Sequence, residues 1–303
     1  MKSFLVILMQ KANEIREHIS AIEQTRKITG AMEMISSNRM RQVMGHIEHN
    51  RVYITYIRRA MKEILASSQD VTHPFLYERE RQHCTYVVIS GDKGFCGAHN
   101  SAVLNYALEK YLSNPGCGLI TLGITAEAFF HSHNITPNAI MPGIVQDPTL
   151  ERVREVASTL TDMFDNVQTD ERRVIYTSFY GETKRQPVEA RLLPVFLQDY
   201  IDIRDAEEIE SIIYHPSAQT VFDLMVPQFI IGFLFGIMVQ AYASEHFARM
   251  TAMRSATTNA KEMIDKLKTQ YNMARQSAIT NELAEIADAA EILKGEQQYD
   301  GEY

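Results

Sequence analysis

The chain has 303 residues, of which 45% are hydrophobic and 22% charged, and its net charge is −8. These values are typical of a soluble globular protein with room for one or two domains. The negative charge and the lack of a Lys/Arg block argue against a general nucleic-acid binder, because neutralising phosphates requires a basic surface. Cys84, Cys96 and Cys117 stand at spacings that fit neither a disulfide framework nor a metal site. We expect them to be packing residues in a reducing compartment.

Two apolar runs interrupt this soluble composition. Residues 4–9 are apolar but are not followed by a small-residue cleavage site, so they do not predict a signal peptide. Residues 229–239 are interrupted by Gly232 and Gly236 and fall short of the roughly 18 residues that a spanning helix needs. We therefore expect membrane contact only through partner proteins.

Proline placement divides the chain into three parts. All nine prolines lie between positions 74 and 227, and proline is the strongest helix breaker. The proline-free ends predict long helices over about 12–66 and 220–293, which would be roughly 80 and 110 Å long at ~1.5 Å per residue. We predict an N-terminal coiled-coil helix within 1–73, a central domain over 74–227, and a C-terminal coiled-coil helix with an acidic tail over 228–303.

Both ends carry apolar residues at steps of three and four, the pattern of a coiled-coil seam. Within the proline-free ends, this pattern predicts an antiparallel pair. A polar stretch at 24–29 interrupts the first seam and suggests contact with something other than the partner helix. A homodimeric coiled-coil scaffold fits the periodicity equally well. The main seam positions are Ile15, Ile19, Ile22, Met32, Met253, Ala256, Ala260, Met263, Leu267, Tyr271, Ala274, Ala278, Ile279, Leu283 and Ile286.

The middle of the chain alternates strand and helix signals. In chain order we predict a strand at 86–90, a glycine turn at 91–97, and a helix at 101–112 with Asn100 as its N-cap. Strands at 118–122, 174–180 and 190–196, a helix at 150–164 and a loop at 134–148 complete the prediction. This alternation predicts a Rossmann-like α/β domain with a largely parallel sheet.

A glycine turn between strand and helix raises the possibility of a nucleotide-binding enzyme. Gly91, Gly94 and Gly97 match neither of the common phosphate-binding spacings, and Lys93 lies inside the turn instead of at the helix start. No acidic residue follows Leu122 to hold a ribose hydroxyl. We therefore favour a tight turn over a nucleotide site. We expect no cofactor, metal or catalytic residue, and the enzyme reading stays as an alternative.

Several segments resemble the gamma subunit of F-type ATP synthases. They are residues 14–19 and 25–34, the turn at 90–97 with Asn100, and residues 243–253 and 271–286. The resemblance implies a non-catalytic central stalk that couples ion flow to ATP synthesis by rotation. Its partners would be three alpha and three beta subunits, the epsilon subunit and the membrane c-ring. The chain would then be a peripheral membrane protein on the cytoplasmic face of a bacterial inner membrane, or on an organellar inner face.

The same resemblance assigns individual residues. It implies that Arg275 and Gln276 hydrogen-bond a loop of a beta subunit, with Thr280 and Glu282 on the same face. It ties Met32 and Arg249 to efficient coupling. It also implies no thiol control, because the chain lacks the dithiol insertion of chloroplast relatives. Departures from the family pattern are Gly30, a helix-weakening residue, and a charged tip at Asp288, Glu291 and Lys294.

Overall fold

The computed structural model describes residues 2–68, 70–76, 84–165, 170–181, 185–196 and 213–299. The chain divides into two compact units, which are described separately below. Unit 1 comprises residues 1–33 and 253–303, and unit 2 comprises residues 34–252. Helices α1 (Lys2–Ser67) and α5 (Ala218–Tyr299) contribute to both units, which confirms the two long terminal helices. Residues 300–303, the end of the predicted acidic tail, lie outside the described residues.

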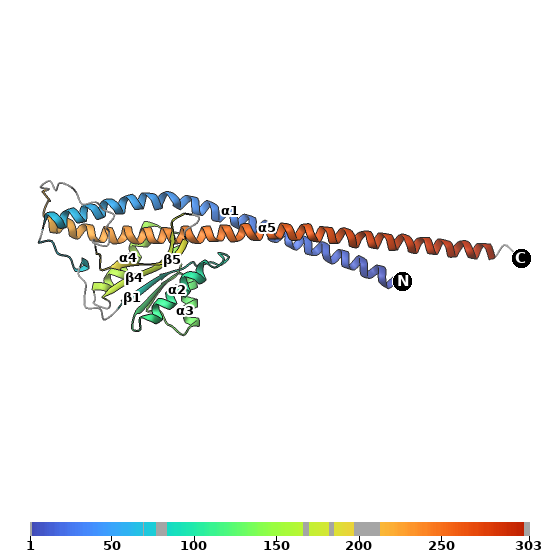
Figure 1. Ribbon diagram of the computed structural model, residues 1–303, viewed down its shortest axis with the longest axis horizontal. Helices are drawn as coiled ribbons and strands as arrows, with labels where there is room; N and C mark the ends of the chain where they lie inside the picture. The colour runs from blue at the N-terminus through green and yellow to red at the C-terminus, as the bar shows by residue number, and fades with distance from the viewer. Residues whose placement is uncertain are drawn as a thin grey trace. The chain divides into compact units, whose positions relative to one another are not determined.

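Unit 2 contains a five-stranded sheet in the order β3-β2-β1-β4-β5. Three of its strands, β1, β4 and β5, are labelled in Figure 1. Strands β1 to β4 are parallel to their neighbours among themselves, and β5 runs antiparallel to β4. This confirms a largely parallel sheet, and the order 3-2-1-4 is that of a doubly wound Rossmann fold. The strands are β1 (Cys84–Ile89), β2 (Gly118–Leu122), β3 (Ala139–Met141), β4 (Glu171–Phe179) and β5 (Arg185–Leu193).

Helices cover both faces of this sheet. Val88 and Ile175 point to one face and pack on α2 and α3, whereas Val87 and Val174 point to the other and pack on α4 and on parts of α1 and α5. The alternation follows from the two-residue period of a strand. The remaining helices are α2 (His99–Ser113), α3 (Ile124–Ser132) and α4 (Leu150–Asp165), with short 3-10 turns at Pro74–Leu76 and Ile144–Gln146.

Three predicted details of the middle domain are wrong. The cap of α2 is Ala98, and Asn100 lies within the helix. The Asn100 amide instead accepts a hydrogen bond from the Gly91 N–H at 3.0 Å and donates one to the Lys93 carbonyl at 3.3 Å. The predicted loop at 134–148 contains β3, and helix α3 was not predicted at all. Both elements are short, because α3 has nine residues and β3 has three, so they carry little periodic signal.

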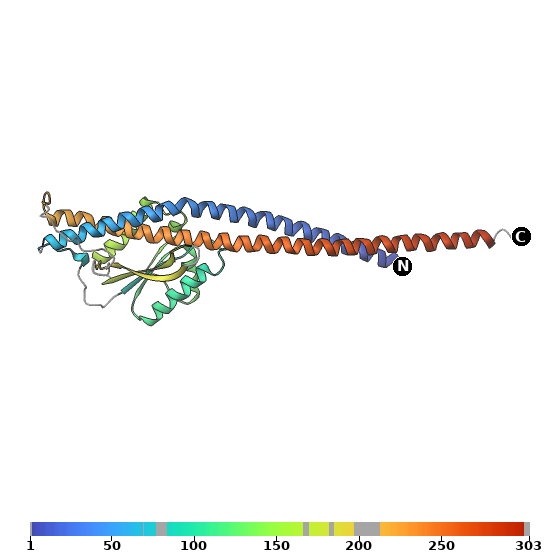
Figure 2. The same cartoon turned by 45° about the horizontal axis from the view of Figure 1, so that its top comes forward.

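Glycines in α5 let the two long helices of unit 2 pack closely (Figure 2). A Cβ on Gly232 would lie 2.6 Å from Cε1 of Tyr53, and one on Gly236 would lie 2.3 Å from Nδ2 of Asn50. Gly232 neighbours Tyr53, and Gly236, which is later in α5, neighbours Asn50, which is earlier in α1. The two helices are therefore antiparallel. By length and composition alone, α5 is long and apolar enough to cross a membrane. However, Phe229 of its apolar stretch belongs to the core of unit 2.

In unit 1 the beginning of α1 and the end of α5 also pair antiparallel. The Thr257 hydroxyl donates to Oγ1 of Thr29 at 2.8 Å, and Arg254 Nε donates to the Glu33 carboxylate at 2.8 Å. Thr29 is therefore buried against the partner helix, which corrects the expectation that the whole 24–29 stretch faces elsewhere. One seam position also shifts, because Ile264 is buried and Met263 is 51% exposed.

Candidate coupling surface

The far part of α5 in unit 1 exposes a row of large apolar side chains. Ile279, Leu283 and Ile286 are 42%, 62% and 60% exposed. Their steps of four and three residues put them on one side of the helix. A contiguous apolar surface on a soluble chain marks a contact with another protein. The described side chains of the N-terminal helix leave this part of the predicted seam exposed.

The four polar positions that were predicted to grip a partner surround this row. Arg275, Gln276, Thr280 and Glu282 are all exposed. None of them makes a side-chain hydrogen bond or ion pair with the described part of the chain, so each can bond to a partner. They do not all share one face. Gln276 and Thr280 line a shallow hollow of about 380 Å³ together with Met273, Ser277 and Asn281.

Arg275 and Glu282 form the second pair of this set. They are seven residues apart, about two helical turns, and so project from one side of α5. Neither lines the hollow. The structure therefore brings the predicted residues together as two pairs, one at the hollow and one beside it.

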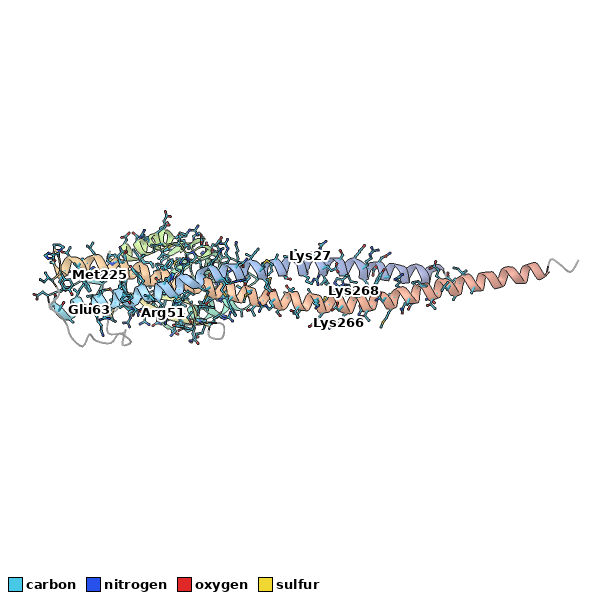
Figure 3. All side chains as sticks on the ribbon, turned by 90° about the horizontal axis from the view of Figure 1, so that it is seen from above. Lys27, Arg51, Glu63, Met225, Lys266 and Lys268 are labelled. Carbon is cyan, nitrogen blue, oxygen red and sulfur yellow. The ribbon has the colours of Figure 1, made fainter. Side chains whose placement is uncertain are left out.

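Met32 is half-buried on α1 of unit 1. One turn earlier, Ile28 is 61% exposed, so α1 also presents an apolar side chain outward. Lys27, Lys266 and Lys268 extend from the two helices of this unit and are exposed (Figure 3). Apolar side chains and exposed basic side chains together form a surface suited to a protein partner.

Arg249, the remaining predicted residue, is not on a surface. It is 6% exposed within unit 2 and bridges α5 to the glycine turn after β1. Its Nε donates to the Gly94 carbonyl at 3.1 Å, and its Nη2 donates to the Lys93 carbonyl at 3.2 Å and to the Glu245 carboxylate. Glu245 was not predicted, although it stands four residues before Arg249, the usual spacing of a helical ion pair.

The turn itself is tightly held. Ile124 N–H donates to the Asp92 carboxylate at 2.7 Å. Phe95 has a φ of +61°, a backbone conformation that is rare outside glycine, and its ring is 70% exposed. With Asn100 and Arg249 bonded to its carbonyls, the turn is fixed from α2, α3 and α5.

Burial sets the ionisation of this junction. It raises the pKa of the Glu245 carboxyl, and the Arg249 guanidinium opposes that shift. Burial also lowers the pKa of His99 and of His246 to about 4, with Arg249 the next largest cause for both. Arg249 and Glu245 form an ion pair by geometry, beside two histidines whose neutral form is favoured by burial.

The same geometry bears on the nucleotide alternative. A Cβ on Gly91 would lie 2.7 Å from Cδ of Glu245, so the carboxylate of this chain packs directly against the turn. A carboxylate at that place repels a phosphate, and the Asn100 amide has taken the Gly91 N–H. Gly91 therefore serves close packing, and Gly97, with a φ of +58°, serves the tight turn that the sequence suggested.

Other contacts of α5 were also not predicted. The Ser244 hydroxyl lies 3.2 and 3.1 Å from the carbonyls of Thr177 and Ser178, and the Gln240 side chain accepts from the Phe179 N–H at 3.4 Å. These bonds attach α5 to the end of β4. Their only sequence signal is the presence of polar residues on an otherwise apolar helix face.

Comparisons with known proteins agree with this architecture. A family model described as ATP synthase matches residues 11–293. An ATP synthase gamma chain of Caldanaerobacter subterraneus is 33% identical, covering 92% of this chain and 99% of the relative. One of Symbiobacterium thermophilum is also 33% identical, covering 95% of this chain and 100% of the relative.

Solved structures share the fold. A chain in the Euglena gracilis mitochondrial ATP synthase, in a structure of OSCP, F1 and c-ring, superposes with a TM-score of 0.66. It is 18% identical, and the match covers 95% of this chain and 96% of that one. A chain of the Tetrahymena thermophila mitochondrial ATP synthase central stalk and c-ring gives a TM-score of 0.59 at 18% identity. The sequence matches, which span nearly the whole chain, show that it belongs to the family of ATP synthase gamma chains.

Proposed function

We propose that this chain is the rotating central-stalk subunit of an ATP synthase and that it grips its catalytic partner through the far part of α5. As a gamma-chain family member, it is a subunit of a complex that makes ATP, and its general role is coupling by rotation. The observation that carries the proposal is the exposed apolar row Ile279, Leu283 and Ile286, flanked by polar side chains that have no bonding partner within the described chain.

In this mechanism the subunit contributes shape and does no chemistry of its own. As the stalk turns, each catalytic subunit meets a different side of α5, and differential contact shifts it between conformations. Apolar side chains slide with little directional preference, whereas hydrogen bonds to charged groups favour particular angles by about 1.5–3 kcal/mol each. Arg275 and Glu282 supply charged contacts, and Gln276 and Thr280 supply neutral ones.

Arg249 acts indirectly in this proposal. Because it is buried and bonded to the turn after β1, it positions the exposed Phe95 and the start of α2 relative to α5. Met32 is half-buried, so it contributes through packing as well as through its exposed surface. Both residues tune the coupling without providing the grip.

The partners we assign are three alpha and three beta subunits around the helices of unit 1, and the epsilon subunit and c-ring at the α/β domain. We also retain the domain limits at residues 73 and 227. Membrane association is peripheral and through the complex, and we place it on the cytoplasmic face of a bacterial inner membrane. We assign no cofactor, metal or catalytic residue to the chain.

The test is the double variant Arg275→Ala, Gln276→Ala in the assembled complex. We expect normal assembly, because neither side chain bonds within the described chain, and ATP synthesis reduced by several-fold at the same proton or sodium gradient. Lys261→Ala, which removes an exposed charge from the same helix outside this surface, is the matched control and should leave synthesis unchanged.

Two outcomes count against the proposal. Unaltered synthesis in the double variant would show that Arg275 and Gln276 do not grip the catalytic partner, but it would leave the role of the family intact. Purification of the wild-type chain as a homodimer, without alpha and beta subunits, would instead favour a dimeric coiled-coil scaffold.

A further inference from the structure

A polar cavity lies at the amino-terminal ends of β1, β2 and β4 in unit 2. It has a volume of about 350 Å³, and two of its lining residues are Cys84 and Cys117, with Tyr86, Asn114 and Arg173 beside them. Both cysteines are half-exposed and free, whereas Cys96 is buried elsewhere in the unit. The cavity therefore makes two of the three thiols accessible to a small solute.

Strand register puts these two thiols side by side. Thr85 pairs with Gly118 across the parallel strands β1 and β2, and each cysteine directly precedes one member of that pair. Neighbouring strands are about 4.8 Å apart, within the Cα separation of about 4.4–6.8 Å that a disulfide spans. The Cys117 thiol lies close enough to Cys84 to affect the pKa of its thiol. The juxtaposition arises from the fold, because the cysteines are far apart in sequence.

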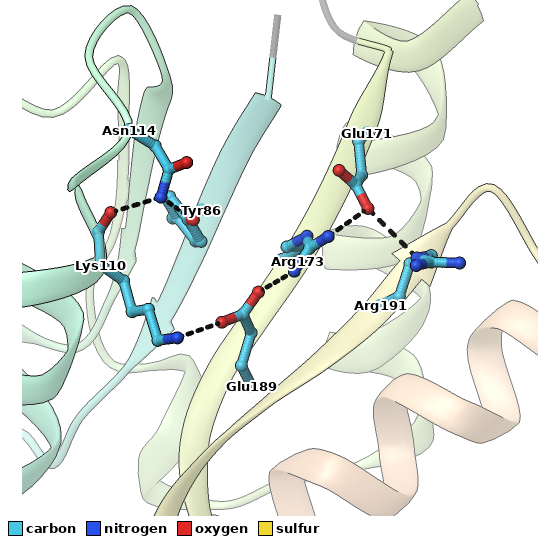
Figure 4. Close-up of polar contacts among 7 residues, drawn as sticks. All are labelled: Tyr86, Lys110, Asn114, Glu171, Arg173, Glu189 and Arg191. Atoms are coloured by element: carbon cyan, nitrogen blue, oxygen red, sulfur yellow. Dashed lines mark hydrogen bonds and ion pairs between the residues drawn. The ribbon is translucent and has the colours of Figure 1, made fainter. Parts of the chain in front are cut away.

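The rim of the cavity is held in place by ion pairs (Figure 4). Glu189 joins Lys110, at 3.5 Å, to Arg173, and Glu171 joins Arg173, at 2.9 Å, to Arg191, at 3.1 Å. The chain of alternating charges crosses β4 and β5. It gives the entrance charged side chains, which suit a water-soluble reagent better than an apolar one.

The environment gives the two thiols different roles. Burial raises the pKa of the Cys84 thiol to about 12, and the nearby Cys117 and Glu171 act in the same direction. Cys84 is thus protonated at neutral pH and is a poor first nucleophile. The first attack on a disulfide then falls to Cys117, with Cys84 as the second thiol.

We propose that Cys84 and Cys117 form a dithiol site that exchanges with small-molecule disulfides and closes into an intramolecular disulfide. The Cys117 thiolate attacks one sulfur of the reagent, and the leaving thiolate takes up a proton. Cys84, losing its proton to solvent, then attacks the Cys117 sulfur of the mixed disulfide and releases the second thiol. Two protein thiols are oxidised, and one external disulfide is reduced to two thiols.

The experiment uses the full chain and bis(2-hydroxyethyl) disulfide, a small neutral reagent. After reaction, denaturation and thiol titration, the wild type should fall from three titratable thiols to one. Peptide mapping should find the Cys84 and Cys117 peptides joined, and dithiothreitol should separate them. Cys96→Ser is the matched control, which should form the same joined peptide at the same rate.

The single variants distinguish the steps. Cys84→Ser should stop at a stable mixed disulfide on Cys117, and Cys117→Ser should react at least ten-fold more slowly. Three thiols retained in the wild type, a mixed disulfide that never closes, or a joined peptide containing Cys96 would each overturn the proposal. Circular dichroism checks the fold of each variant. If a serine variant fails to fold, the wild-type peptide map alone decides between these pairings.

Discussion

His246 is held neutral inside unit 2, and this links the stability of the fold to pH. Its Nδ1 is buried without a hydrogen-bond partner among the described residues, and its folded pKa of about 4 lies below the usual 6.5. The unfolded state therefore binds more protons between these values, so the free energy of unfolding falls as the pH drops from 6.5 towards 4. The charged groups that oppose its protonation are Arg249, Arg39 and Lys93.

We expect His246→Phe to reduce this acid sensitivity. Between pH 7.5 and 5.0 the variant should lose about 2 kcal/mol less unfolding free energy than the wild type, measured by urea denaturation. His131→Gln, at an exposed position on α3, is the control and should follow the wild type. Equal losses in all three proteins would show that His246 is not protonated on unfolding in this range.

Arg172 is a second buried charge, and it leads to an unusual expectation. It is 0% exposed on β4, and none of its three nitrogens has a hydrogen-bond partner among the described residues. Burial lowers its pKa to about 10. Because an unpaired buried charge costs more than an apolar side chain of similar size, Arg172→Met should leave the free energy of unfolding unchanged or raise it by about 1 kcal/mol.

Urea denaturation checks this expectation beside Arg173→Met, which removes a guanidinium paired with Glu171 and Glu189. The Arg173 variant should lose stability, by about 1 kcal/mol. A loss of several kcal/mol in the Arg172 variant would contradict the expectation and point to a carboxylate partner outside the described residues.

Single residues were the hardest level to predict from sequence. Arg249 was singled out only through a family resemblance, and its burial against the turn depends on how α5 packs on β1. Asn100 was assigned a capping role from its local position, but a contact nine residues away, with Gly91, decides its conformation. Cys84 and Cys117 become neighbours only through sheet register. Side-chain partners distant in sequence leave no periodic signal.

Two glycines in the long helices have opposite effects on stability. A Cβ on Gly30 meets no atom within 4 Å, whereas one on Gly236 would meet Asn50 Nδ2 at 2.3 Å. Since alanine favours a helix by about 1 kcal/mol over glycine, Gly30→Ala should stabilise α1 by about 0.5–1 kcal/mol. Gly236→Ala should instead destabilise, because the Asn50 side chain must leave its place against α5.

Thermal unfolding followed by circular dichroism measures both changes. The two substitutions add the same methyl group, so each serves as the control for the other. A melting temperature that moves in the same direction for both would contradict the argument from packing.

Elements were predictable in proportion to their length. The absence of proline predicted α1 and α5, and β-branched runs predicted β1 and β2. Helix α5 nevertheless contains Pro227, because packing of its apolar face outweighs the loss of one backbone hydrogen bond. The short elements α3 and β3 were missed, and they exist because the sheet and its neighbours complete them.

The whole molecule consists of two units that differ in how they are stabilised. Unit 2 has a sheet with helices on both faces and a large buried core. In unit 1, the described buried residues are few and are confined to a two-helix seam, among them Met253, Ala260, Ile264 and Ala278. The family resemblance predicts a helical shaft and an α/β base, and the domain limits at residues 73 and 227 stay a prediction.

This contrast predicts how the isolated chain exchanges its amide hydrogens. Few buried apolar contacts allow local opening, so residues 12–33 and 253–287 should exchange at least ten-fold faster than β1 and β4 in hydrogen-exchange mass spectrometry. Assembly with alpha and beta subunits should slow the exchange of 253–287 most, because partners then cover Ile279, Leu283 and Ile286. Equal protection of this segment in the free and assembled chain would mean that its exposed apolar row is not the surface that the partners bind.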